Sequence, residues 1–191
     1  MLQGHVADKA VYINSGCTGA EIDVAKAIRR LLDGLIGELV FLCIGTHRIP
    51  GDSLGPRIGQ SLKASPLAMR NGLHISGTLQ TPVHAKNLQE TIENIYRNCK
   101  NAKIVAIDAS LGRPENVGFI TLGQGSLNPG IGINKRLPPV GDIFITGIVN
   151  HSGDMNLASL QNSRISTVTR LADVISNGIV SAICNKEFLW A

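Results

Sequence analysis

Apolar side chains follow two different spacings along this chain. In residues 18–35 (TGAEIDVAKAIRRLLDGL) and residues 87–99 they recur every three or four positions, which predicts two amphipathic helices. Residues 38–45 (ELVFLCIG) and residues 103–110 (KIVAIDAS) are instead nearly continuous apolar runs of strand length. Runs of this kind are typical of parallel strands that are covered on both faces. The pattern therefore predicts helices that alternate with buried strands.

The two predicted helices have distinct local signals. Thr18 and Glu21 have the spacing of a capping box at the start of the first helix, which is expected to end within residues 34–37. In the second helix, Glu93 and Arg97 stand in the favourable order for an ion pair one turn apart. The expected buried positions are Ile22, Ala25, Ile28, Leu32 and Leu35 in the first helix and Leu88, Ile92, Ile95, Tyr96 and Cys99 in the second.

Weaker patterns complete the series. Pro56 can occupy the first turn of a helix over residues 55–65, and residues 154–185 have a helical spacing that fits one long helix or two joined helices. Residues 124–141 are rich in glycine and proline and are expected to lack regular structure, which in a compact domain usually marks a functional or mobile loop. Further short strands are expected at residues 73–77, 116–123 and 142–149.

Strands that alternate with helices imply one fold class. We expect a three-layer α/β fold with a mostly parallel mixed sheet and helices on both faces, formed by residues 1–191 as a single domain. Open sheets of this class bind ligands at the carboxyl ends of the strands, near the point where the strand order reverses. Residues that directly follow a strand are therefore the first candidates for a site.

The charge balance changes this picture little. The formal net charge is +4 and the pI is near 9.0, but the basic residues are scattered and aromatic residues make up only 4% of the chain. Nucleic-acid-binding surfaces gather basic residues on one face and stack bases on aromatic rings. No nucleic-acid partner is therefore expected.

The cysteines and the first residues bear on the compartment. Cys17, Cys43, Cys99 and Cys184 show no C-x-x-C spacing, so we expect mostly small buried thiols rather than disulfides or a zinc site. The first ten residues, MLQGHVADKA, lack the basic and apolar regions of a secretory leader, and no run reaches the roughly 18 apolar residues of a membrane span. The expectation is a cytoplasmic protein without membrane association.

Two aspartates stand where buried strands are predicted to end. Asp52 follows the first apolar run within the turn IGTHRIPGDSLGP, and Asp108 ends the second run in VAIDAS. If the two strands are neighbours, about 4.8 Å apart, both carboxylates face one site. Two close carboxylates share one proton, so one can activate water while the other protonates a carbonyl oxygen or a leaving group. The alternative is that each aspartate only caps a turn or the next helix.

Other side chains offer weaker chemistry. His84 precedes the helix at residues 87–99 and can reach the same edge, as a structural or a functional histidine. Together with Asp52 and Asp108 it makes a conceivable metal-ligand set, although the spacing does not require one. The glycines of LGQGSLNPGIGIN lack the G-K-[ST] of a phosphate loop and the third glycine of a dinucleotide fingerprint. A serine nucleophile, a metal and a nucleotide cofactor are not expected.

Three blocks of the chain resemble one family. The blocks are FLCIGTHRIPGDSLGP, SGTLQTPVHAKNL and VAIDASLGRPENVGFITLGQGSLNPGIGINKRLPPVGDIFITGIVN, and they extend from about residue 38 to residue 152 without a large gap. They are similar to the YyaC-type sporulation proteins, a group regarded as spore proteases. That group more distantly resembles the germination protease of spores and the hydrogenase maturation endopeptidases. The resemblance implies a phosphorylase/hydrolase-like fold with a central mixed sheet.

The same resemblance implies roles for individual residues. The two aspartates regarded as catalytic in the germination protease fall on Asp52 and Asp108. A glycine-rich stretch of that protease is similar to PGIGINKR, which implies that Asn134 and Lys135 line the substrate site. In the hydrogenase maturation enzymes a nickel-binding Glu follows the first Asp, but here Ser53 holds that position. Nickel recognition is therefore not implied.

Three functions are open at this point. The first is a sporulation-associated peptidase in which Asp52 and Asp108 activate water, while His84 and residues 124–141 shape the substrate groove. The second is a non-catalytic protein that binds a peptide or a partner on the same scaffold. The third is a metal-dependent amidase or other small-molecule hydrolase. For the first, the resemblance implies a protein or peptide substrate, such as small acid-soluble spore proteins, in the cytoplasm of the forespore or spore.

Overall fold

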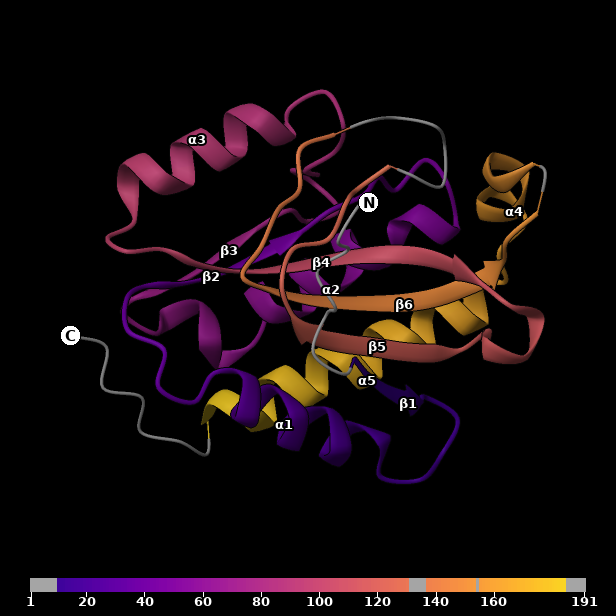
Figure 1. The fold of residues 1–191 in the computed structure, drawn as a ribbon, viewed down its shortest axis with the longest axis horizontal. Coiled ribbons are helices and arrows are strands. Elements are labelled where there is room, and N and C mark those ends of the chain that lie inside the picture. Colours follow the sequence, from indigo (N-terminus) through magenta and orange to yellow (C-terminus); the bar gives the residue numbers. More distant parts are fainter. Residues whose placement is uncertain (1–9, 131–136, 154, 185–191) are drawn as a thin grey trace, which may run out of the picture.

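A six-stranded sheet forms the centre of the molecule (Figure 1). The computed structural model describes residues 10–130, 137–153 and 155–184. The strands are β1 (Val11–Asn14), β2 (Leu39–Cys43), β3 (Leu73–Ser76), β4 (Lys103–Gly112), β5 (Phe119–Gln124) and β6 (Ile143–His151). The helices are α1 (Ala20–Leu31), α2 (Leu54–Lys63), α3 (Leu88–Asn98), α4 (Asn156–Gln161) and α5 (Ile165–Cys184), with short 3₁₀ turns at η1 (Gly51–Ser53), η2 (Pro66–Met69) and η3 (Pro114–Asn116).

The sheet is mixed and mostly parallel, as the sequence predicts. Its strand order is β1-β5-β6-β4-β2-β3. Three neighbouring pairs, β3 with β2, β2 with β4 and β4 with β6, are parallel. The strands β5 and β1 extend the sheet in antiparallel pairing.

Two apolar cores lie on opposite faces of this sheet and make a three-layer fold. One face is covered by α1, α2 and α5, and the other by α3 (Figure 1). Strand β2 contributes to both cores because its side chains alternate: Phe41 and Cys43 face α2, whereas Val40 and Leu42 face α3. All five residues of β2 are buried, which confirms the prediction of a strand covered on both sides.

The strand order reverses between β2 and β4. From β2 the chain runs through α2 to β3 on one side, and from β3 it returns through α3 to β4 on the other side of β2. After β4 the chain forms β5 and then β6, and β6 pairs with β4 on the side away from β2. The segments that leave the carboxyl ends of β2 and β4 therefore diverge, and this divergence opens a crevice at that edge.

Several local expectations about the helices are wrong. Helix α1 begins after Gly19, which is in the left-handed conformation (φ 81°), and no side chain caps it, so Thr18 and Glu21 form no capping box. Ile22 (54% exposed) and Tyr96 (60% exposed) point to solvent rather than to the core. The Glu93 carboxylate accepts a hydrogen bond from Gln89, and no ion pair joins it to Arg97 among the described contacts. The exposure of Ile22 and Tyr96 was mispredicted because periodicity alone does not fix where an apolar stripe ends.

The remaining segments are closer to the expectation. The apolar pattern after residue 154 forms two helices, α4 and α5, rather than one. The described ends of the segment between β5 and β6 contain some regular pairing, because Leu127 and Val140 exchange two backbone hydrogen bonds in an antiparallel bridge. Of the four cysteines, all with free thiols, Cys43 is buried, Cys99 is partly buried, and Cys17 and Cys184 are exposed, so the prediction of mostly buried thiols is wrong. No described helix has the length and apolar character to cross a membrane.

Helix α2 packs against the end of β2 through glycines. Pro56 lies in the first turn of α2, as predicted, and the neighbouring Gly55 faces the backbone of Ile44, the residue that follows β2. A Cβ atom at Gly55 would lie 2.1 Å from the Ile44 carbonyl oxygen, a distance that real Cβ atoms do not reach. The contact is between two backbones, so no side-chain rotation can relieve it. Gly55 therefore fixes how closely α2 approaches the sheet.

We expect Gly55→Ala to lower the free energy of unfolding by about 1–3 kcal/mol or more, the usual effect of overpacking. Urea unfolding measures the change. The matched control is Gly153→Ala, because a Cβ atom at Gly153 would have no heavy atom of another segment within 4 Å. Equal stability of the two variants would contradict the close approach of α2 to Ile44.

Candidate functional site

Asp52 is placed by a tight turn after β2. The turn leaves the strand through Gly45, which has a φ of +137°, and returns to η1, where Asp52 is the middle residue. The Thr46 N–H donates to the Asp52 carbonyl oxygen (3.0 Å). A Cβ atom at Gly45 would lie 2.0 Å from that same oxygen. Glycine is therefore required at position 45, and the turn returns Asp52 to the end of its strand.

Ser53 stabilises this turn. It stands in the motif GDSLG, which matches the G-x-S-x-G pattern of a nucleophile elbow. The Ser53 hydroxyl donates to the Pro50 carbonyl oxygen (2.6 Å) and accepts from Arg57 Nε (3.1 Å), and the residue is only 3% exposed. Its hydrogen bonds hold η1 together, and it lies outside the hollows described below. These contacts give Ser53 a structural role in the turn, and the expectation that it is not a nucleophile stays a prediction.

Asp108 does not end its strand, contrary to the expectation from the sequence: it lies within β4, which continues to Gly112, and stands opposite Thr146 of β6. Its Oδ1 accepts a hydrogen bond from the Ala109 N–H (2.8 Å). Because β4 pairs directly with β2, Asp108 and Asp52 lie at the same edge of the sheet, and both line the same two hollows. As expected from the sequence, the two carboxylates border the same site, at the point where the strand order reverses.

The environment of Asp108 favours its protonated form. Burial of the carboxyl group raises its pKa well above the ordinary value, and the charge of Asp52 raises it further. The Ala109 N–H lowers the pKa, but to a smaller extent. The protonated form of Asp108 is therefore favoured more than that of an ordinary aspartate, in the direction expected when two carboxyl groups lie close together.

Two hollows meet at the two carboxylates. Asp52, Asp108 and Gly130 line both of them, so together the hollows form a groove with the carboxylates at its middle. The first hollow, of about 360 Å³, adds the hydroxyl and amide side chains of Ser110, Asn128, Thr146, Ser152 and Asn156. The second, of about 240 Å³, adds Ile44, Ile49, Leu137, His84 and the two cations Arg48 and Lys86.

A chain of hydroxyl groups runs from the first hollow into the sheet. Ser110 Oγ donates to Thr146 Oγ1 (3.3 Å), and Thr146 Oγ1 shares a hydrogen bond with Thr121 Oγ1 (2.7 Å). Thr146 was not among the residues expected from the sequence, although a polar residue in the middle of the apolar run DIFITGIV is a usable signal. Its importance follows from the register, which places Thr146 directly beside Asp108.

His84 reaches the groove from the loop that precedes α3. Val83 forms a parallel bridge with Ile44, and the His84 N–H donates to the Asn87 side-chain oxygen (2.8 Å). His84 lines the second hollow together with both aspartates, and its Nδ1 is buried without a hydrogen-bond partner in the described structure. Its placement agrees with the expectation that it shapes the groove, and its role stays a prediction.

Residues 127–130 and Leu137, from the described ends of the segment between β5 and β6, border the groove. Leu127, Asn128 and Gly130 border the first hollow, and Pro129, Gly130 and Leu137 border the second. The predicted substrate-binding residues Asn134 and Lys135 lie outside the described residues.

The metal-ligand set left open by the sequence does not form. All three residues lie in the described ranges 10–130, 137–153 and 155–184. The possible ligand atoms of Asp52, Asp108 and His84 do not all lie within 4.8 Å of one another.

Known proteins show three similarities. The family model described as "Protein of unknown function (DUF1256)" matches residues 16–178. The curated "Uncharacterized protein YyaC" of Bacillus subtilis (strain 168) is 43% identical over 160 residues, which are 81% of this chain and 77% of that protein, and this confirms the resemblance to YyaC-type proteins. The solved [NiFe] hydrogenase maturation protease HycI from Thermococcus kodakarensis KOD1 is 12% identical, with a TM-score of 0.39, over 78% of this chain and 98% of that chain. The last likeness is distant, and the site residues are assigned from the geometry of this chain alone.

The raised pKa of Asp108 predicts a pH-dependent stability. The native state holds a proton that the unfolded chain releases, so the free energy of unfolding falls as the pH rises from the ordinary aspartate pKa to the raised one. Asp108→Asn cannot ionise and keeps an acceptor for the Ala109 N–H. We expect its Tm to exceed that of the wild type at pH 8, with a difference that shrinks towards pH 4. Thermal unfolding measures both, with exposed Asp23→Asn as the control, and a difference independent of pH would contradict the assignment.

Proposed function

Since the chain belongs to the family of proteins of unknown function DUF1256, we propose for it a hydrolase activity in which Asp52 and Asp108 cleave a peptide bond. One observation carries the proposal. Two carboxylates, one kept protonated by its burial and by the charge of the other, stand in the middle of a groove at the reversal of strand order. Pairs of carboxyl groups with separated pKa values are a recurrent basis of acid–base hydrolysis.

The two aspartates take opposite roles in the first step. The Asp52 carboxylate accepts a proton from a water molecule as the water oxygen attacks the carbonyl carbon of the substrate. Protonated Asp108 donates its proton to the carbonyl oxygen, so that no oxyanion accumulates. After this step Asp52 holds the proton and Asp108 is ionised.

The second step restores the pair. The tetrahedral intermediate collapses as its C–N bond breaks, and the leaving amine takes the proton from Asp52. The remaining hydroxyl proton returns to Asp108 as the carboxyl product forms. The cycle consumes one water molecule and leaves both aspartates in their starting states, so it needs no further reactant.

The shape of the groove suits an extended polypeptide. Because both hollows are lined by the two carboxylates, a chain that occupies both can bring a peptide bond to the pair. Hydroxyl and amide groups of the first hollow can hydrogen-bond a peptide backbone, with Thr146 and Ser110 nearest to Asp108 in the sheet. Arg48 and Lys86 in the second hollow favour an acidic side chain on that side of the scissile bond.

The proposal extends to the biological setting. We place the activity in sporulating cells, with small acid-soluble spore proteins as candidate substrates, on the basis of the similarity to YyaC-type proteins. His84 and the segment between β5 and β6 are proposed to position the substrate, because both border the groove.

Asp52→Asn and Asp108→Asn are each expected to lower cleavage by about 10²–10⁴-fold, the usual contribution of general acid–base catalysis. The assay is mass spectrometry of a peptide library incubated with the protein, with Asp23→Asn, an exposed carboxylate on α1, as the matched control. Cleavage by Asp52→Asn at the wild-type rate would exclude the mechanism. Stoichiometric peptide binding without any product would favour a non-catalytic binding protein.

The pH profile is a separate expected result. Activity needs one proton on the pair, so kcat/KM should fall at acid pH as the pair takes up a second proton. It should also fall at alkaline pH as Asp108 loses its proton, at a pH above the ordinary aspartate range because its pKa is raised. The measurement is kcat/KM on the best library peptide from pH 3 to 9. A rate that rises steadily over the whole range would contradict a protonated Asp108.

A further inference from the structure

A second set of chemically reactive side chains lies at the amino ends of the strands, opposite the carboxylate groove. Glu38 immediately precedes β2, His74 is the second residue of β3, and Cys99 follows α3 before β4 begins. We call these three residues the amino-edge cluster. They come together because β2 pairs in parallel with both β3 and β4, which brings the entrances of all three strands side by side.

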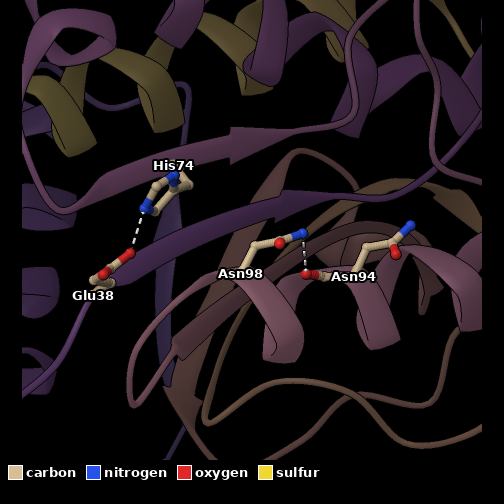
Figure 2. A network of polar contacts seen from close by, with 4 residues as sticks. All are labelled: Glu38, His74, Asn94 and Asn98. Atoms are coloured by element: carbon tan, nitrogen blue, oxygen red, sulfur yellow. Dashed lines mark hydrogen bonds and ion pairs between the residues drawn. The ribbon is translucent and has the colours of Figure 1, made fainter.

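The amino-edge cluster is compact. His74 Nε2 lies 2.7 Å from Glu38 Oε2, and Figure 2 shows the two side chains facing each other from neighbouring segments. One possible ligand atom from each of Glu38, His74 and Cys99 lies within 4.8 Å of the other two. Among the described residues, no other group of three or more His, Cys, Asp and Glu side chains has ligand atoms that all lie within 4.8 Å of one another.

The backbone around the amino-edge cluster is firmly held. The Glu38 N–H donates to the Lys100 carbonyl oxygen (3.1 Å), and the Glu38 carbonyl oxygen accepts from the Lys103 N–H (2.8 Å). In the last turn of α3, just before Cys99, Asn98 Nδ2 donates to the Asn94 carbonyl oxygen (2.9 Å), as Figure 2 also shows. The three possible metal-ligand side chains therefore stand on backbone segments that the sheet and the end of α3 hold in place.

We propose that the amino-edge cluster is a binding site for a divalent transition-metal ion of the Zn²⁺ or Co²⁺ type, held by Glu38, His74 and Cys99. One sulfur, one imidazole nitrogen and one carboxylate oxygen make a donor set that suits these ions, whereas Mg²⁺ and Ca²⁺ take oxygen ligands. The side chains of structural and catalytic zinc sites are drawn from these three residue types.

The geometry needs only a small adjustment. Ligand atoms bonded to a tetrahedral zinc at about 2.0–2.3 Å lie roughly 3.3–3.8 Å from one another. The 2.7 Å Glu38–His74 contact would open by about 0.6 Å, and no pair within 4.8 Å would need to close by more than about 1.5 Å, which side-chain rotation can supply. The fourth position is open to water, since His74 is exposed and Cys99 borders a surface hollow with Leu35 and Tyr96.

The contacts within the amino-edge cluster are those that an ion would replace. The Glu38 carboxylate accepts hydrogen bonds from His74, from the Lys100 backbone and from the Cys99 thiol. A divalent ion would displace the thiol proton and bridge the same three side chains, cross-linking the entrances of β2, β3 and β4.

Sequence spacing hides this site. Glu38 and His74 are 36 positions apart, and neither stands in a C-x-x-C or H-x-x-x-H pattern with Cys99. The site is independent of the proposed peptidase, because none of its three residues lines the carboxylate groove. Failure of one proposal therefore leaves the other standing.

The test is a Co²⁺ titration of untagged, chelator-treated full-length protein, followed by absorption spectroscopy. A thiolate ligand gives a sulfur-to-cobalt charge-transfer band in the near ultraviolet, and tetrahedral Co²⁺ gives intense visible bands. We expect one equivalent to bind with both signals. Cys99→Ser should abolish the charge-transfer band, and His74→Ala and Glu38→Gln should weaken binding at least about tenfold, while Cys17→Ser and His151→Ala, at exposed positions, keep the wild-type spectrum.

A second measurement uses the wild type alone. Bound Zn²⁺ should slow alkylation of Cys99 and raise the Tm, while exposed Cys17 and Cys184 react at an unchanged rate. Mass spectrometry of the modified peptides reads each cysteine separately. Co²⁺ binding without a thiolate band, a band that persists in Cys99→Ser, or no protection of Cys99 would overturn the proposal and leave the amino-edge cluster as a hydrogen-bonded tie between strands.

Discussion

Parallel pairing of β2 with β4, in register from Leu39 opposite Lys103 to Cys43 opposite Ile107, places most of the reactive groups of the two proposed sites, and the pairing of β2 with β3 adds His74. Parallel neighbours begin at one edge of a sheet and end at the other. Asp52 and Asp108 consequently share the carboxyl edge, and Glu38 and Cys99 share the amino edge. A slip of one residue would turn the β2 side chains to the opposite face, and both apolar cores oppose such a slip because they bury alternate residues of the same strand.

The two edges have different electrostatic characters. At the carboxyl edge, burial and the charge of Asp52 raise the pKa of Asp108, so ionisation of Asp108 costs the native state free energy. At the amino edge, a carboxylate gathers hydrogen-bond donors from a histidine and a thiol, so its charge is compensated. A raised carboxyl pKa, as at Asp108, is common where a side chain transfers a proton. A carboxylate surrounded by hydrogen-bond donors, as at Glu38, is common where a cation can replace the donated protons.

Much of this could be predicted from the sequence, for physical reasons that also explain the failures. The strands at residues 38–45 and 103–110 were predictable because burial on both faces leaves continuous apolar runs, and the meeting of Asp52 and Asp108 followed from parallel pairing. The exposure of Ile22 and Tyr96 could not be predicted, because the apolar stripe of a helix does not show how much of it the neighbouring elements cover. Thr146 and the amino-edge cluster depend on strand register and order, which only the folded chain specifies.

The borders of the sheet carry one more consequence. In the described chain the outermost strands, β1 and β3, are only four residues long each, so neither offers a long row of free backbone groups. Short borders protect a protein from sheet-to-sheet aggregation, and they also rule out a binding mode in which a guest peptide adds itself as a further long strand. A polypeptide that reaches Asp52 and Asp108 must therefore cross the strand tips at an angle, held by loops rather than by a ladder. Selectivity in such an arrangement evolves by changes in loops, while the sheet beneath stays constant.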